Sequence, residues 1–182
     1  MKKKLMMISL IVVAVAAVFA IVVALRPADF NVTRSTTIAA APETVFAQVN
    51  ELHKWETWSP WAKMDPNAKT TYEGPAAGVG AAFAWAGNKN IGEGRMVITE
   101  SRPNELVRFR LEFLKPFKGT NAAEFTFKPQ GNNTLVTWTM SGKNNFITKA
   151  VGLFMDCDKM VGSQFEQGLA SMKSIVESTA KK

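Results

Sequence analysis

Few residues in this chain have the type and spacing needed for catalysis or metal binding. The chain has one cysteine, Cys157, and one histidine, His53, so an intrachain disulfide and a cysteine or histidine metal cluster are both excluded. Cys157 stands among apolar residues at helical spacing, which favours a buried structural thiol over a nucleophile. His53 ends a predicted helix and fits a surface or capping role better than that of a base. We therefore expect no metal or other cofactor.

Glu100 is the one weak candidate for a catalytic acid or base. It belongs to a set of charged residues that alternate along two successive predicted strands and favour cross-strand ion pairs on a solvated face. That set consists of Glu93, Arg95, Glu100, Arg108, Arg110 and Glu112. If Glu100 instead shares the inward parity of Met96 and Ile98, its carboxylate could hold a polar group of a ligand or transfer a proton.

Three tryptophans, Trp55, Trp58 and Trp61, lie within seven residues at a spacing of three. This spacing places them along one side of a helical turn. The first interpretation is that they pack short helices onto a sheet. A second is an aromatic gate to an internal cavity, and a third is an aromatic lip that enters a membrane interface.

The amino terminus has the pattern of a membrane anchor. A basic start at residues 1–4 precedes residues 5–25, which contain no charged side chain. At about 1.5 Å per helical residue this segment spans about 31 Å, close to the roughly 30 Å of a bilayer core. An uncleaved transmembrane helix is favoured over a signal peptide because the apolar run is long. The lysines that precede it favour a cytoplasmic amino terminus, hence a single-pass inner-membrane protein with a periplasmic or extracytoplasmic body.

The body of the chain fits one domain. A linker at 26–29 leads to residues 30–182, enough for a single core. Basic and acidic residues are interspersed there without a long run of one sign, which argues against nucleic-acid binding. Nothing indicates an oligomer, so a monomer is assumed.

The hydrophobic pattern of this domain predicts an α+β fold. Residues 30–38 alternate as a strand, Pro42 opens a short helix, and a second short helix breaks at Pro60. Six extended segments separated by turn residues follow, which predicts a seven-stranded antiparallel sheet. They cover residues 69–73, 79–86, 93–100, 105–114, 121–129 and 134–142. Apolar residues from Phe146 to Val176 then recur every three or four positions and predict one long helix packed on the sheet.

Several short motifs along residues 30–181 resemble the SRPBCC superfamily, and bacterial members of its polyketide cyclase/dehydrase group in particular. The matching segments include residues 41–46, 55–61, 78–80, 85–88, 92–94, 158–162 and 165–169. The resemblance implies the helix-grip (START-like) fold, in which a seven-stranded antiparallel sheet wraps around a long C-terminal helix, with two short helices after the first strand. It also implies a cavity between the sheet and that helix for an apolar small molecule.

The inferred inward parity assigns aromatic, methionine and aliphatic side chains to this cavity. The predicted ligand-binding residues are Trp58, Trp61, Phe83, Trp85, Met96, Ile98, Phe109, Phe113, Phe125, Trp138, Met140 and Phe165. The same side chains could equally fill a solid core. We therefore predict a membrane-anchored protein that binds a lipid or other hydrophobic molecule. The alternatives are a polyketide cyclase/aromatase-type enzyme and a protein-interaction domain similar to activators of heat-shock chaperones.

Overall fold

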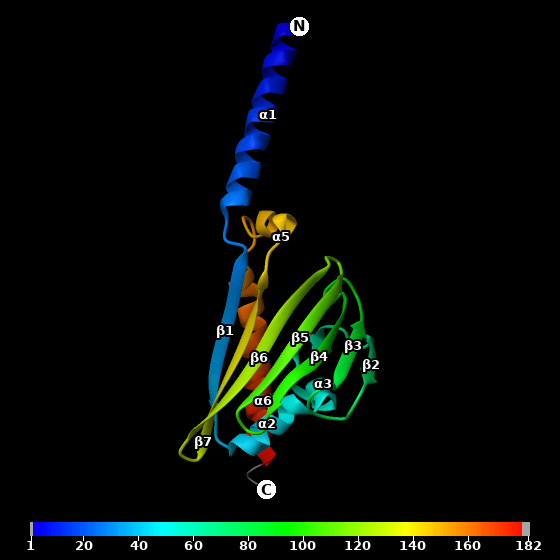
Figure 1. Cartoon of the computed structure of the whole chain (residues 1–182), viewed down its shortest axis with the longest axis vertical. Helices are drawn as coiled ribbons and strands as arrows, with labels where there is room; N and C mark the ends of the chain where they lie inside the picture. Colours follow the sequence, from blue (N-terminus) through cyan, green and yellow to red (C-terminus); the bar gives the residue numbers. More distant parts are fainter. Residues whose placement is uncertain (1, 180–182) are drawn as a thin grey trace.

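A computed structural model describes residues 2–179. Its first element is the apolar helix α1 (Lys2–Leu25), which projects away from the rest of the chain (Figure 1). This helix is long and apolar enough to cross a membrane or to serve as a signal sequence. Its side chains are exposed except for Val23, which is fully buried where α1 packs on the later helix α5.

A single sheet follows α1 and an extended linker. Its strands run in the order β1-β7-β6-β5-β4-β3-β2, and all neighbours are antiparallel. The strands are β1 (Asp29–Ile38), β2 (Lys69–Glu73), β3 (Ala82–Ala86), β4 (Glu93–Arg102), β5 (Leu106–Lys115), β6 (Gly119–Gln130) and β7 (Asn133–Lys143). The predicted seven-stranded antiparallel sheet is thus confirmed, because alternation and turn residues determine it locally.

Short helices between β1 and β2 cover the distal part of one sheet face, which we call the inner face. They are α2 (Pro42–Asn50), the 3-10 turn η1 (Leu52–Lys54), α3 (Trp55–Trp58) and α4 (Pro60–Met64). Proline at the first position of α2 and of α4 suits the helix start, where a backbone N–H is not needed. Extended Ser59 separates α3 from α4, so the break predicted at Pro60 is present.

The predicted long C-terminal helix is confirmed, but the expectation that it begins at Phe146 is wrong, because two helices occupy that region. They are α5 (Phe146–Val151) and α6 (Cys157–Thr179), and the sheet wraps around α6 (Figure 1). The N–H of Thr148 donates to Asn145 Oδ1 (2.9 Å) and caps α5. The N–H of Lys159 donates to Asp156 Oδ1 (3.0 Å) and caps α6. The apolar periodicity continues through both helices, but these caps and the intervening Gly152 interrupt the helix.

The break also corrects the prediction for Cys157. Its thiol is exposed at the first residue of α6 rather than buried in an apolar stripe. Phe146 and Phe154, which belonged to the predicted stripe, are likewise exposed, by 53% and 81%. The stripe that packs on the sheet is confined to α6 and consists of Gly162, Phe165, Gly168, Leu169, Met172 and Val176.

Candidate functional site

An aromatic cluster occupies the space between the inner face and α6. Trp138 on β7 lies at its centre and stacks on Phe165 of α6, with ring centroids 4.0 Å apart and planes at 7°. Phe125 on β6 stacks on the opposite side at 4.6 Å. Trp58 and Trp61 meet the Trp138 ring edge-on, each at 5.7 Å. These contacts fill the deep part of the predicted cavity with mutually packed rings.

The predicted ligand-binding residues divide into two groups by burial. Eight are buried in the core: Trp58, Met96, Ile98, Phe109, Phe125, Trp138, Met140 and Phe165. Four are half-buried: Trp61, Phe83, Trp85 and Phe113. The structure therefore brings all of them to the space around the inner face, while their role in ligand binding remains a prediction.

Two polar atoms in this region are buried without a hydrogen-bond partner among the described residues, Trp138 Nε1 and Gln164 Oε1. The neighbouring indoles are satisfied: Trp55 Nε1 donates to Val49 O (2.9 Å) and Trp58 Nε1 donates to Gln48 O (3.0 Å). Trp138 is 2% exposed, so bulk solvent does not reach this N–H. A buried N–H without a partner carries a cost of about 1–3 kcal/mol, and native structures seldom leave one unpaired.

Gln164 lies on the same side of α6 as the Trp138 contact. A Cβ added at Gly168 would lie 3.0 Å from Trp138 Cζ3, and Gln164 precedes Gly168 by one helical turn. The two atoms are one donor and one acceptor, and Gln164 as a whole is half-buried. Sequence reasoning missed Gln164 because a polar residue on an amphipathic helix ordinarily indicates a solvated position.

Burial along the inner face decreases towards the end from which α1 emerges. On β5, Val107 and Phe109 are 0% and 1% exposed, whereas Leu111 and Phe113 are half-buried. Phe30 at the start of β1 and Val161 near the start of α6 are also half-buried and pack against the core. We call these four half-buried residues, Phe30, Leu111, Phe113 and Val161, the open end of the inner face.

Two surface hollows lie away from this aromatic cluster. One, of about 390 Å³, separates α4 from α6 and is lined by residues that include Lys63, Met64 and Gln167. The other, of about 610 Å³, lies between the end of α1 and the α5–α6 connection, beside Arg26, Lys149 and Phe154. Neither hollow is lined by the predicted ligand-binding residues.

Arg34 is a charged residue on the inner face that sequence reasoning did not single out. It lies opposite Trp138 in the β1–β7 register and crosses to α6, where it pairs with Asp158 (3.0 Å) and Glu166 (2.7 Å). Its guanidinium fits against Gly162, where any side chain would collide with it. The hydrogen bond from Arg34 lowers the pKa of Asp158 and raises that of Arg34. These pairs fasten the first turns of α6 to β1.

Glu100 lies on the outer face of the sheet, so the inward parity considered for it is wrong. In the register of β4 with β5, Ile98 faces Phe109 and Glu100 faces Arg108, which makes Thr99 the extra residue of a bulge. The bulge reverses the parity after Ile98. Glu100 pairs there with Arg108, which also pairs with Glu124 at 2.6 Å. Of the cross-strand ion pairs predicted among the charged residues of these two strands, that of Glu100 with Arg108 is present.

The tryptophan lip at a membrane is also wrong, because Trp55 and Trp58 are 7% and 0% exposed within the core. His53 is exposed and stacks on Tyr72 at a centroid distance of 3.7 Å. The Tyr72 hydroxyl donates to Glu56 Oε1 (2.6 Å), and burial together with this bond raises the pKa of Tyr72. The geometry around His53 is that of a surface contact between η1 and β2.

An open antiparallel sheet wrapped around one long helix, with short helices after the first strand, defines the helix-grip fold. Solved structures share it. A protein from Mesorhizobium loti is 15% identical, with a TM-score of 0.62, and the match covers 82% of this chain and 98% of that one. The Aha1 dimer from Colwellia psychrerythraea is 20% identical, with a TM-score of 0.59, and the match covers 81% and 96%.

A third similar structure is StfQ, a di-domain ARO/CYC protein of the steffimycin biosynthetic pathway. It is 11% identical, with a TM-score of 0.61, and the match covers 85% of this chain and 53% of StfQ. No curated protein matches the sequence. Residues 29–177 match the family described as polyketide cyclase / dehydrase and lipid transport. The chain belongs to this family.

Proposed function

We propose that this protein is a membrane-anchored binding protein for a lipid or another hydrophobic molecule, held between the sheet and α6. The family to which the chain belongs includes lipid transport in its description. The observation that carries the proposal is the Trp138 N–H, which is buried inside an aromatic cluster without an acceptor among residues 2–179. An apolar ligand that carries one oxygen atom would supply that acceptor and keep its remaining surface in an apolar environment.

The open end is the proposed route to this donor. Leu111, Phe113 and Val161 would contact the hydrocarbon part of the ligand. Trp61 is half-buried and lies edge-on to Trp138, so its displacement would give a carbonyl or hydroxyl oxygen access to Trp138 Nε1. Gln164 Oε1 would accept a hydrogen bond from a ligand hydroxyl. Trp61 thereby acts as the aromatic gate that its position in the sequence suggested.

The proposed anchor is α1, retained in the inner membrane with the domain on the extracytoplasmic side. Val79 provides a test because it is 60% exposed in the loop between β2 and β3. In a Cys157→Ser background, Val79→Cys should react with a membrane-impermeant maleimide in intact cells whose outer layer is permeable. Labelling only after lysis would contradict the proposed topology, and recovery of the protein without α1 would contradict the retained anchor.

Ligand binding is tested by photocrosslinking with a fatty acid that carries a diazirine, applied to the full chain in nanodiscs. We expect labelled peptides from the inner face of β5 and from α6, and competition by unlabelled fatty acid. Val161→Trp should fill the open end and abolish this labelling, whereas Val79→Trp, an identical change at an exposed site, should not. Labelling confined to α1 and the outer surface would overturn the proposal.

A further inference from the structure

Exposed apolar side chains of the domain are concentrated in two segments. Outside α1, ten large hydrophobic residues are exposed among the described residues, and eight of them fall within 114–117 and 146–160. The other two, Met64 and Val79, lie apart from them. We call Leu114, Phe117, Phe146, Ile147, Phe154 and Met155 the apolar collar. Their exposure ranges from 47% for Met155 to 81% for Phe154. Clusters of this kind mark interaction sites, whereas single exposed apolar residues do not.

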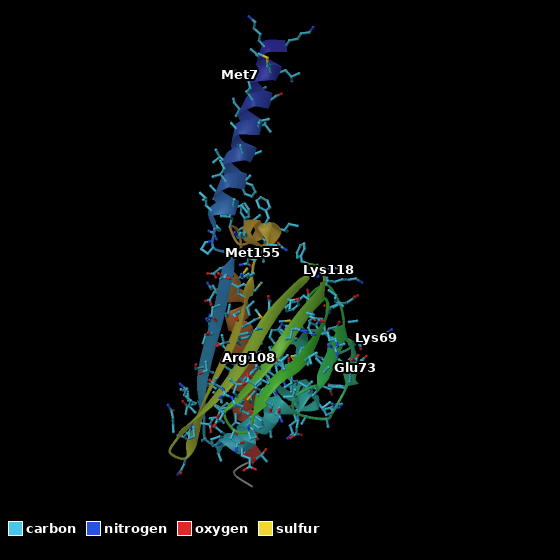
Figure 2. The ribbon with its side chains drawn as sticks, viewed as in Figure 1. Met7, Lys69, Glu73, Arg108, Lys118 and Met155 are labelled. Atoms are coloured by element: carbon cyan, nitrogen blue, oxygen red, sulfur yellow. The ribbon has the colours of Figure 1, made fainter. Side chains whose placement is uncertain are left out.

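Both segments lie at the end of the domain from which α1 emerges. Figure 2 places Met155, on the α5–α6 connection, and Lys118, at the β5–β6 turn, at this end, whereas Arg108 lies further along the sheet. The register agrees, because Gly142 near the end of β7 faces both Phe30 near the start of β1 and Asn121 near the start of β6. The hairpin tip and the α5 region therefore lie on the same side of the domain.

Hydrogen bonds hold the α5 part of the collar beside the end of α1. Lys149 Nζ of α5 donates to Ala24 O (3.3 Å), and Arg26 Nη1 donates to Gly152 O (3.0 Å). Residues 5–25 of α1 are long enough to span the whole of a hydrocarbon core of roughly 30 Å, so Ala24 lies close to its boundary. In a protein anchored by α1, these bonds would hold helix α5 at the membrane interface. None of its residues is buried in the protein.

The charge of the same segments is complementary to anionic lipid. Residues 114–118 and 143–160 contain five lysines and two aspartates. Two of these seven residues have ion-pair partners outside the segments, because Asp158 pairs with Arg34 and Lys115 pairs with Glu93. Lysines that surround exposed apolar side chains are typical of surfaces that insert into the interface of an anionic bilayer.

We propose that the apolar collar inserts into the interface of the bilayer that α1 spans, with its lysines on anionic headgroups. The open end of the inner face, which lies at the same end of the domain, then faces the lipid directly. This inference rests on the proposed anchoring by α1, and it adds that an apolar ligand passes between the bilayer and the inner face without crossing bulk water.

The test uses the full chain in vesicles of phosphatidylcholine and phosphatidylglycerol. An environment-sensitive fluorophore is attached to Phe154→Cys or Phe117→Cys in a Cys157→Ser background, with Val79→Cys as the control at an exposed apolar position outside the collar. We expect blue-shifted emission and quenching by nitroxide-labelled lipid at positions 154 and 117 but not at 79. Lys118→Glu should reduce quenching at 117, whereas Lys128→Glu, on the distal part of β6, should not.

Three results would contradict the inference in distinguishable ways. If the labels at 154 and 117 remain in water, as at 79, in a protein that still resists carbonate extraction, insertion of the collar is refuted while anchoring by α1 stands. Crosslinking between copies through position 154, without quenching by lipid, would assign the surface to a second copy of the chain. Release of the full chain by carbonate would instead refute anchoring by α1, on which the proposed function depends.

Discussion

Replacement of Trp138 by phenylalanine should cost much less stability than the same replacement at Trp58. Both indoles are buried, 2% and 0% exposed, and they contact each other at 5.7 Å. Both variants lose the same atoms, so the packing loss is similar in the two cases. They differ in the indole N–H, because Trp58 Nε1 donates to Gln48 O at 3.0 Å, whereas Trp138 Nε1 has no acceptor in the part of the chain that the structure describes.

The difference can be worked out from these partners. Trp58→Phe removes a hydrogen bond worth about 0.5–1.5 kcal/mol, whereas Trp138→Phe relieves a buried N–H that costs about 1–3 kcal/mol. Trp138→Phe should therefore retain about 1.5–4.5 kcal/mol more stability than Trp58→Phe. For a chain of this size that corresponds to a melting temperature higher by at least about 3 °C.

The assay is thermal unfolding of the delipidated full chain in a mild detergent. Trp55→Phe serves as a second control, because Trp55 Nε1 donates to Val49 O, and it should behave as Trp58→Phe does. Saturation with an oxygen-containing apolar ligand should stabilise the wild-type protein more than it stabilises the Trp138→Phe variant. Equal destabilisation by the Trp138 and Trp58 variants would show that the Trp138 N–H already has a hydrogen-bond partner. It would then not be free to donate to a ligand oxygen, and the proposed binding mode would be refuted.

Two further predictions concern the framework of the domain. Gly94→Ala should destabilise the protein by about 1–3 kcal/mol, since its Cβ would lie 2.6 Å from Trp85 Cη2, whereas Gly119→Ala has open space and should be neutral in the same denaturation assay. The Arg34 hydrogen bond lowers the pKa of Asp158, so its stabilisation is present above the ordinary aspartate pKa of about 3.9 and is lost as the pH falls through the lower folded value. The measurement is the stability against unfolding below about pH 4. Asp158→Asn should remove the part of the acid-dependent loss of stability that Asp158 causes, and an unchanged pH profile would contradict the pairing.

Sequence patterns predicted the sheet well because strand alternation and turn residues act locally. Val107, Phe109, Leu111 and Phe113 alternate with charged residues, and each lies on the inner face. Periodicity could not reveal the boundary between α5 and α6, since apolar spacing continues across it. The cap formed by Asp156 was the available signal.

The candidate site depended on features that a single sequence does not display. The bulge at Thr99 reverses the face on which Glu100 lies, and it is visible only in the pairing of β4 with β5. Arg34 shares the inward parity of Val32, and its charge is accommodated there because Gly162 leaves room for its guanidinium to pair with Asp158 and Glu166 on α6. The missing partner of Trp138 Nε1 likewise arises from tertiary packing.

Native mass spectrometry of the full chain, extracted from its own membranes in mild detergent, tests the central claim most directly. Organic extraction of the same sample would identify the chemical class of anything retained. Our account predicts one apolar, oxygen-containing molecule per chain, lost or reduced in Val161→Trp and retained in Val79→Trp. A protein that emerges empty, and that remains empty when supplied with fatty acids and phospholipids, would contradict it.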